Sequence, residues 1–177
     1  MKTQEILISG FGGQGILFAG KFLAYKGLTD EKNVSWLPSY GPEMRGGTAS
    51  CGIIVSDIPV GSPIVTYPTC LIAMNLPSLE KFENSVVPGG IIIVDSTLVD
   101  KKVEREDVTA FYVPATKLAK ENGFGSLANM ILIGKLLKEC PDFDIANCEQ
   151  TLQKVIPPQK AEMAGINMKA IELGYNF

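Results

Sequence analysis

The chain of 177 residues contains no histidine, and this absence excludes more chemistry than any other feature of the sequence. Without an imidazole there is no Ser-His or Cys-His nucleophile pair and no histidine metal ligand. There is also no side chain whose ordinary pKa makes it a general base near neutral pH. If the chain takes part in catalysis, another chain or a cofactor therefore supplies the reacting atoms.

Cysteine is scarce and badly spaced for metal binding. Cys51, Cys70, Cys140 and Cys148 form no Cys-x-x-Cys pair, and no proline-terminated cluster-binding run occurs. We therefore expect this chain alone to build neither an iron–sulfur cluster nor a structural zinc site. Cys51 and Cys70 lie in apolar, strand-like sequence, where a thiol behaves as a small buried hydrophobe.

Long apolar runs and a strong net charge are also absent. No run approaches the roughly 20 residues needed to span a bilayer, and residues 1–5 are too polar to begin a signal peptide. The formal net charge is -3 and the Lys and Arg residues are scattered, which argues against nucleic-acid binding. With 46% apolar residues, the sequence predicts one soluble, cytoplasmic domain over residues 1–177, with neither nucleic acid nor membrane as a partner.

Short strand-like runs alternate with helix-like segments along the chain. We expect strands over residues 5–9, 34–37, 49–55, 69–74, 91–94 and 108–113, and helices over residues 14–26, 76–82, 127–139, 148–155 and 159–173. Gly27 and Gly174 are expected to close two helices, and Ser126 to cap a third. The pattern predicts a three-layer α/β domain with a mainly parallel or mixed central sheet, a Rossmann-like first strand–glycine loop–helix unit and a helical C-terminal third.

The first chemical motif is Gly-Phe-Gly-Gly-Gln-Gly at residues 10–15, which matches G-x-G-x-x-G between a strand and a helix. Such glycines let the backbone approach a diphosphate, and the following helix start supplies amide donors. A nicotinamide-binding domain also needs an acidic residue at the end of the second strand, and here no carboxylate follows that strand until Glu43. The motif therefore favours phosphate contact or close packing over NAD(P), and a tight turn without a ligand is an alternative.

The second motif lies at residues 38–48, Pro-Ser-Tyr-Gly-Pro-Glu-Met-Arg-Gly-Gly-Thr. A simple connection between strands needs only a few polar residues. This one combines stiff prolines with permissive glycines and presents Tyr40, Glu43 and Arg45. Functional side chains are often carried on loops held by a rigid scaffold, although a turn with solvated charges is an alternative.

Together these motifs resemble one family, the gamma subunit of the 2-oxoacid:ferredoxin oxidoreductases, which corresponds to the gamma domain of single-chain pyruvate:ferredoxin oxidoreductase. The resemblance runs from about residue 6 to the C-terminus. Its strongest element is Tyr-Gly-Pro-Glu-Met-Arg-Gly-Gly at residues 40–47. Residues 10–20, 61–63, 95–97 and 128–130 support it.

The resemblance implies a complex that oxidatively decarboxylates a 2-oxoacid, transfers the acyl group to coenzyme A and reduces ferredoxin. This chain would assist assembly and border the path of coenzyme A. The complex would use thiamine diphosphate, Mg, iron–sulfur clusters and coenzyme A, with none of these bound by this chain alone. Its partners would be alpha and beta subunits, with a ferredoxin-like delta subunit left open. A separate gamma chain favours 2-oxoglutarate or a branched-chain 2-oxoacid over pyruvate.

No catalytic residue and no metal ligand is assigned to this chain. The phosphate end of coenzyme A, or less readily the thiamine diphosphate of a neighbouring chain, is expected to contact both loops and the late helix, at Gly12, Gly13, Gln14, Gly15, Arg45, Gly46, Gly47 and Asn129. The guanidinium of Arg45 suits bidentate contact with phosphate. An interface with another subunit is expected at Tyr40, Glu43 and Met44.

Several alternatives stay open at this point. The Asn129 amide would equally satisfy a nearby backbone group, and Asp95 would serve either as a functional carboxylate or as a cap for its own turn. The whole chain would also be consistent with a purely structural assembly subunit that contacts no ligand. An autonomous NAD(P)-binding oxidoreductase is the third possibility, which the half-present fingerprint and the missing histidine count against.

Overall fold

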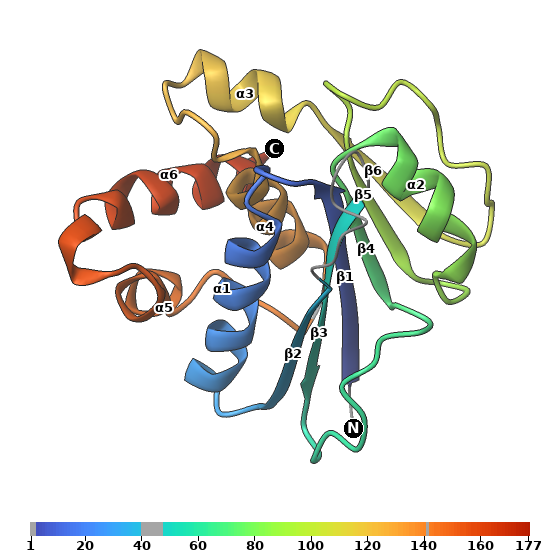
Figure 1. The fold of residues 1–177 in the computed structure, drawn as a ribbon, viewed down its shortest axis with the longest axis horizontal. Coiled ribbons are helices and arrows are strands. Elements are labelled where there is room, and N and C mark those ends of the chain that lie inside the picture. The colour runs from blue at the N-terminus through green and yellow to red at the C-terminus, as the bar shows by residue number, and fades with distance from the viewer. Residues whose placement is uncertain (1–2, 40–47, 141) are drawn as a thin grey trace.

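A six-stranded mixed sheet forms the centre of the molecule, which we describe from a computed structural model over residues 3–39, 48–140 and 142–177 (Figure 1). In spatial order the strands are β2 (Asn33–Ser39), β3 (Thr48–Ser56), β1 (Thr3–Phe11), β4 (Cys70–Ala73), β5 (Ile91–Asp95) and β6 (Thr109–Val113). Strands β1, β4, β5 and β6 are parallel, and β3 is antiparallel to both of its neighbours. The predicted α/β architecture with a mixed sheet is confirmed.

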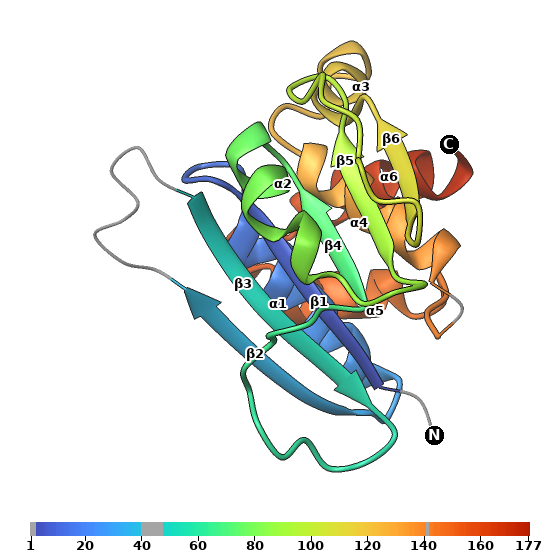
Figure 2. The same cartoon turned by 90° about the vertical axis from the view of Figure 1, so that its right-hand side faces the viewer.

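Helices cover both faces of the sheet (Figures 1 and 2). One face carries α1 (Ile16–Thr29), α4 (Ala128–Glu139), α5 (Cys148–Val155) and α6 (Met163–Asn176), and the other carries α2 (Leu76–Phe82) with the short η2 (Glu83–Ser85). The remaining elements are α3 (Ala115–Glu121), which the sequence pattern did not predict, and η3 (Pro158–Lys160). No helix in the described part of the chain is long and apolar enough to cross a membrane.

Two hydrophobic cores hold these layers together. The larger one lies between the sheet and the helices α1, α4, α5 and α6, and the smaller one lies beneath α2. Within β5 the alternating side chains serve both, since Ile93 belongs to the larger core and Ile92 to the smaller. A strand covered on both faces is apolar at consecutive positions, which explains the unbroken apolar run in β5.

Two glycines that were expected to end helices lie inside them. Helix α1 runs through Gly27 to Thr29, and α6 runs through Gly174 to Asn176. A Cβ at Gly27 would lie 2.7 Å from the Val34 side chain, and one at Gly174 would lie 1.8 Å from the backbone oxygen of Ile131. The predicted stops were wrong because both glycines allow close packing and neither takes a left-handed conformation.

The predicted Ser126 cap was also wrong. Helix α4 begins one residue later, with Leu127 as its N-cap residue, and no side chain accepts from its first amides within the described residues. Gly125, at φ 61°, instead turns the chain into the helix through its backbone.

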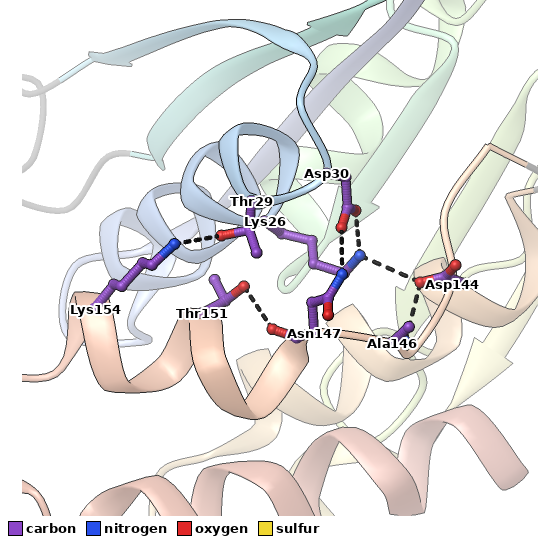
Figure 3. Close-up of polar contacts among 8 residues, drawn as sticks. All are labelled: Lys26, Thr29, Asp30, Asp144, Ala146, Asn147, Thr151 and Lys154. Carbon is purple, nitrogen blue, oxygen red and sulfur yellow. Dashed lines mark hydrogen bonds and ion pairs between the residues drawn. The ribbon is translucent and has the colours of Figure 1, made fainter.

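A buried cation anchors the carboxyl end of α1 (Figure 3). The Lys26 side chain is fully buried, and its Nζ bonds Asp30 and lies 3.3 Å from Asp144 Oδ1. Asn147 Nδ2 donates to Asp30 Oδ1 at 3.2 Å. Helix α1 is thereby tied to the start of α5 at the end opposite the glycine loop.

Candidate functional site

The glycine motif forms the turn between β1 and α1, at the carboxyl edge of the parallel strands. The Gln14 amide donates to the Phe11 carbonyl at 3.3 Å, and Gly13 has φ 89°, as at the third position of a type II turn. Gly15, at φ 73°, is the N-cap residue of α1. No described side chain caps this helix, and its first turn holds no acidic residue. Its first amides and positive dipole end are therefore available to an anion.

Two carboxamide side chains contact this turn. Gln14 Oε1 accepts from the Phe11 amide at 2.6 Å, and Gln14 Nε2 donates to the Met74 carbonyl at 3.1 Å. Asn129 Nδ2 donates to the Gly15 carbonyl at 3.0 Å. The structure thus brings Gln14 and Asn129 together at the loop, each bonded to backbone.

Two hollows border the same turn. One of about 310 Å³ lies beside the start of α1 and β3 and is lined by Phe11, Gly12, Gly13, Gly15, Ile16, Leu17, Phe18 and Ala49. The other, of about 210 Å³, lies toward α3 and α4 and is lined by Gly13, Gln14, Met74, Leu98, Thr116, Gly125, Ser126 and Ala128. Gly13 faces both hollows, and a Cβ built on it would meet no atom within 4 Å.

The strand register places the second motif beside the first. Phe11 pairs with Thr48 across β1 and β3, and Ser39 pairs with Ser50 across β2 and β3. The chain therefore leaves β2 and enters β3 at the edge that carries the glycine turn. The predicted residues of that motif lie outside the described residues: Tyr40, Glu43, Met44, Arg45, Gly46 and Gly47.

This register also separates the site from a dinucleotide-binding domain. There, the strand beside β1 is parallel to it and ends in the acidic residue that holds the ribose. Here the neighbour of β1 is the antiparallel β3, and β2 lies one strand further out. The end of β2 is thus displaced from the glycine loop by the width of a strand.

Asp95, at the carboxyl end of β5, is fully buried and bonded. Its oxygens accept from the Thr97 amide at 3.1 Å and from the Thr116 hydroxyl and amide at 2.6 and 3.3 Å. The carboxylate therefore holds its own turn and the start of α3, as the capping alternative expects.

The thiols are not placed for nucleophilic chemistry. All four cysteines are buried. Burial raises the pKa of the Cys51 thiol to about 12, and the Cys51 Sγ lies 3.5 Å from the Ile16 carbonyl behind the glycine loop. A buried thiol that stays protonated is a poor nucleophile. Within the described residues, no group of three or more Cys, Asp or Glu side chains could hold a metal ion.

Sequence reasoning missed a surface over β2 and β3 whose main hollow is lined by no charged residue. This β2–β3 face is crossed by residues 57–69 (Figure 2) and has a hollow of about 330 Å³ lined by Leu7, Leu37, Ser39, Ser50, Gly52, Pro63, Ile64, Val65, Thr66, Phe82 and Ser85. Ile64 and Tyr67 are 63% and 67% exposed. The available signal was the lack of any Lys, Arg, Asp or Glu between Asp57 and Glu80.

Comparisons with known proteins bear on this site. The family model for pyruvate ferredoxin/flavodoxin oxidoreductase matches residues 5–177. Ketoisovalerate oxidoreductase subunit VorA of Methanothermobacter marburgensis is 44% identical over 133 residues, which is 75% of this chain but only 28% of that protein. The 2-oxoglutarate synthase subunit KorC of Methanocaldococcus jannaschii is 33% identical, with 97% of this chain and 92% of that protein covered.

A solved structure agrees with these relatives. The gamma subunit of a keto/oxoacid ferredoxin oxidoreductase from Geobacter sulfurreducens PCA superposes with a TM-score of 0.82 at 27% identity. The match covers 98% of this chain and 96% of that one. The similarity therefore extends over nearly the whole chain.

Proposed function

The chain belongs to the pyruvate ferredoxin/flavodoxin oxidoreductase family, and we propose that it serves as the gamma subunit of a complex that oxidises a 2-oxoacid to an acyl-coenzyme A and carbon dioxide. Thiamine diphosphate, Mg and the iron–sulfur clusters lie in partner subunits, and ferredoxin takes the electrons. The absence of histidine from the sequence and the protonated state of the buried Cys51 support a role without a reacting residue. VorA supports the same assignment. The region of VorA that is related to this chain makes up only 28% of that subunit, so this chain corresponds to one part of a larger oxidoreductase subunit.

The observation that carries the ligand part of the proposal is the uncapped start of α1 at the glycine turn. Helix starts with free amides and no nearby carboxylate favour phosphate groups. We propose that the amides of Gly12, Gly13 and Gly15 face the phosphate end of coenzyme A, with Arg45, Gly46 and Gly47 completing the anion site. The pairing of Phe11 with Thr48 supports this, because it joins the two segments at one edge. Gln14 and Asn129 contribute to this anion site through their contacts with the glycine turn.

The β2–β3 face supports a role in assembly. Interfaces are depleted of charged residues at their centres, and this face combines exposed Ile64 and Tyr67 with a sequence that is uncharged between Asp57 and Glu80. We propose that another subunit of the oxidoreductase packs here, next to the predicted contacts of Tyr40, Glu43 and Met44. The chain would then order coenzyme A at a boundary between subunits.

The names of two relatives support the proposed choice of substrate. The names VorA and KorC concern ketoisovalerate and 2-oxoglutarate. We propose a branched-chain 2-oxoacid first, since the VorA relative has the higher identity, and 2-oxoglutarate second. Substrate choice itself belongs to the partner subunits that hold thiamine diphosphate.

Purification of the native complex through a tag on this chain tests the proposal. The isolated complex should contain additional subunits and should reduce ferredoxin only when a 2-oxoacid and coenzyme A are both supplied. A panel of ketoisovalerate, 2-oxoglutarate and pyruvate then identifies the substrate. A chain that purifies alone, or a complex whose activity is indifferent to coenzyme A, would contradict the assignment. NAD(P)-dependent activity of the chain by itself would instead support the autonomous oxidoreductase.

A further inference from the structure

Two glycines of the turn, Gly10 and Gly15, lie against carboxamide side chains. A Cβ at Gly10 would lie 2.4 Å from Gln14 Oε1, and a Cβ at Gly15 would lie 2.5 Å from Asn129 Nδ2. The side chains of Gln14 and Asn129 thus lie directly against the first and last glycines of the fingerprint, and Gly15 also takes a φ of 73° that favours glycine. Both side chains are turned into the fold, toward backbone groups that they bond.

Asn129 sets the direction of one peptide group. The Gly15 carbonyl accepts from both Asn129 Nδ2 and the Ala19 amide, each at 3.0 Å. A trans peptide is planar, so the N–H of the next residue points opposite to that carbonyl. The Ile16 amide is therefore directed out of the helix start, toward the mouth of the turn.

Gln14 locks the other half of the turn to the neighbouring strand. Its Oε1 accepts from the Phe11 amide at 2.6 Å, and its Nε2 donates to the Met74 carbonyl at 3.1 Å, directly after β4. The Met74 amide in turn donates to the Ser9 carbonyl of β1 at 2.8 Å. The turn is thereby held to two strands, and Phe11, Gly12 and Gly13 remain exposed.

We propose that Gln14 and Asn129 are positioning residues that hold the amides of the glycine turn, and the adjoining Ile16 amide at the start of α1, in the geometry that accepts the phosphate end of coenzyme A. The inference rests on the proposed function. It differs from direct contact, because both side chains act through backbone groups. Asn129 is 4% exposed, so its replacement changes the turn without removing a surface group from the ligand.

The test uses the complex assembled with its partner subunits, with Asn129→Ala and Gln14→Ala compared with the original chain. Each variant should raise the KM for coenzyme A about tenfold, the equivalent of roughly 1.4 kcal/mol. The KM for the 2-oxoacid and the kcat at saturating coenzyme A should stay within about twofold, a change worth only roughly 0.4 kcal/mol. Gln14 is only half-buried, so its variant tests the proposal even if Asn129→Ala does not assemble.

Asn167→Ala is the matched control. Asn167 is 3% exposed, its Nδ2 donates to the Met163 carbonyl at 2.8 Å, and its Oδ1 is buried without a partner among the described residues, as is the Oδ1 of Asn129. It lies in α6, away from the turn. Its variant should lose a similar amount of stability and leave the KM for coenzyme A unchanged.

The Gly12→Glu variant distinguishes failure of the positioning role from failure of the proposed ligand site. Gly12 is exposed and has no positive φ, so its backbone conformation is compatible with a side chain, and a carboxylate there would repel a phosphate. If Gly12→Glu raises the KM for coenzyme A while Asn129→Ala and Gln14→Ala do not, the positioning role is refuted and the ligand site stands. If none of the three changes it, the ligand site is refuted and the positioning role falls with it.

Discussion

Phe11 of β1 lies opposite Thr48 of β3, and this pair brings the two motifs of the sequence to one edge of the sheet. The pairing is antiparallel, so the last residue of β1 meets the first residue of β3. The glycine turn leaves the sheet at this point, and β3 begins here at Thr48. The proposed anion site follows from this one register.

The packing of α6 on α4 depends on Gly174. Because a Cβ at Gly174 would lie 1.8 Å from the Ile131 oxygen, Gly174→Ala forces the two backbones apart. We expect it to lower the free energy of unfolding by about 3 kcal/mol. Urea denaturation of the full chain, followed by circular dichroism, measures the change.

Gly165→Ala in the same helix is the control. Nothing lies within 4 Å of its Cβ position, and Ala is the better helix former, so it should add up to about 1 kcal/mol. Equal effects of the two substitutions would show that the α4–α6 contact is looser than described.

The two carboxylates around Lys26 should differ in their importance. Asp30→Asn leaves a fully buried ammonium whose remaining carboxylate partner, Asp144 at 3.3 Å, is 69% exposed, and should cost about 3 kcal/mol. Asp144→Asn removes a solvated partner and should cost less than about 1 kcal/mol. Unfolding of both variants in urea compares them. A larger loss of stability for Asp144→Asn would contradict this prediction, because Asp144 and not Asp30 would then be the main counter-charge of Lys26.

The cysteine thiols should not react with thiol reagents in the native chain. Because burial raises the pKa of Cys51 and Cys148 to about 12, a thiol reagent at pH 8 should modify neither until the chain unfolds. The unfolded thiols ionise from about pH 8.5 while the folded ones stay protonated, so the Cys51 contribution to stability is full below that pH and is lost toward pH 12. Cys51→Ala should therefore flatten the alkaline loss of stability. A thiol that reacts rapidly in the native chain would contradict this.

The β2–β3 face should be required for assembly. Ile64→Lys places a charge at the hollow of the β2–β3 face, which no charged residue lines, and we expect at least about a tenfold loss of affinity for the partner subunits, or roughly 1.4 kcal/mol. Leu28→Lys is the matched control, since Leu28 is 57% exposed at the end of α1, on the helix-covered side. Co-purification with tagged partner subunits compares them. If both variants assemble equally well, another surface binds the partners.

The sequence predicted the strands and most helices because their apolar periodicity is a local property. The sequence-based prediction failed where a tertiary contact determines the local structure. Gly27 and Gly174 resemble helix stops in sequence, but only the neighbours Val34 and Ile131 reveal them as packing sites. Helix α3 is short, and the start of it is held by the distant carboxylate of Asp95 rather than by its own pattern.

The sequence identified which residues form the candidate site, but not which groups their side chains contact. Adjacent strand and helix patterns identified the glycine turn. The positions of Gln14 and Asn129 depend on Met74 and on a contact that spans 114 residues, from Asn129 to Gly15. No spacing rule contains such contacts, so the sequence left open whether Asn129 meets a ligand or a backbone group, and it did not identify the backbone partners of Gln14.

The most direct test of the central claim is the coenzyme A dependence of the assembled complex carrying Arg45→Ala, with Arg45→Lys beside it. Loss of a guanidinium that binds phosphate should raise the KM for coenzyme A by about 10- to 100-fold in Arg45→Ala. Arg45→Lys should raise the KM for coenzyme A less, because it keeps the positive charge. The KM for the 2-oxoacid and the subunit composition should not change. Unchanged coenzyme A kinetics in a complex that assembles normally would contradict the claim, and impaired assembly with normal kinetics would leave the chain a purely structural subunit.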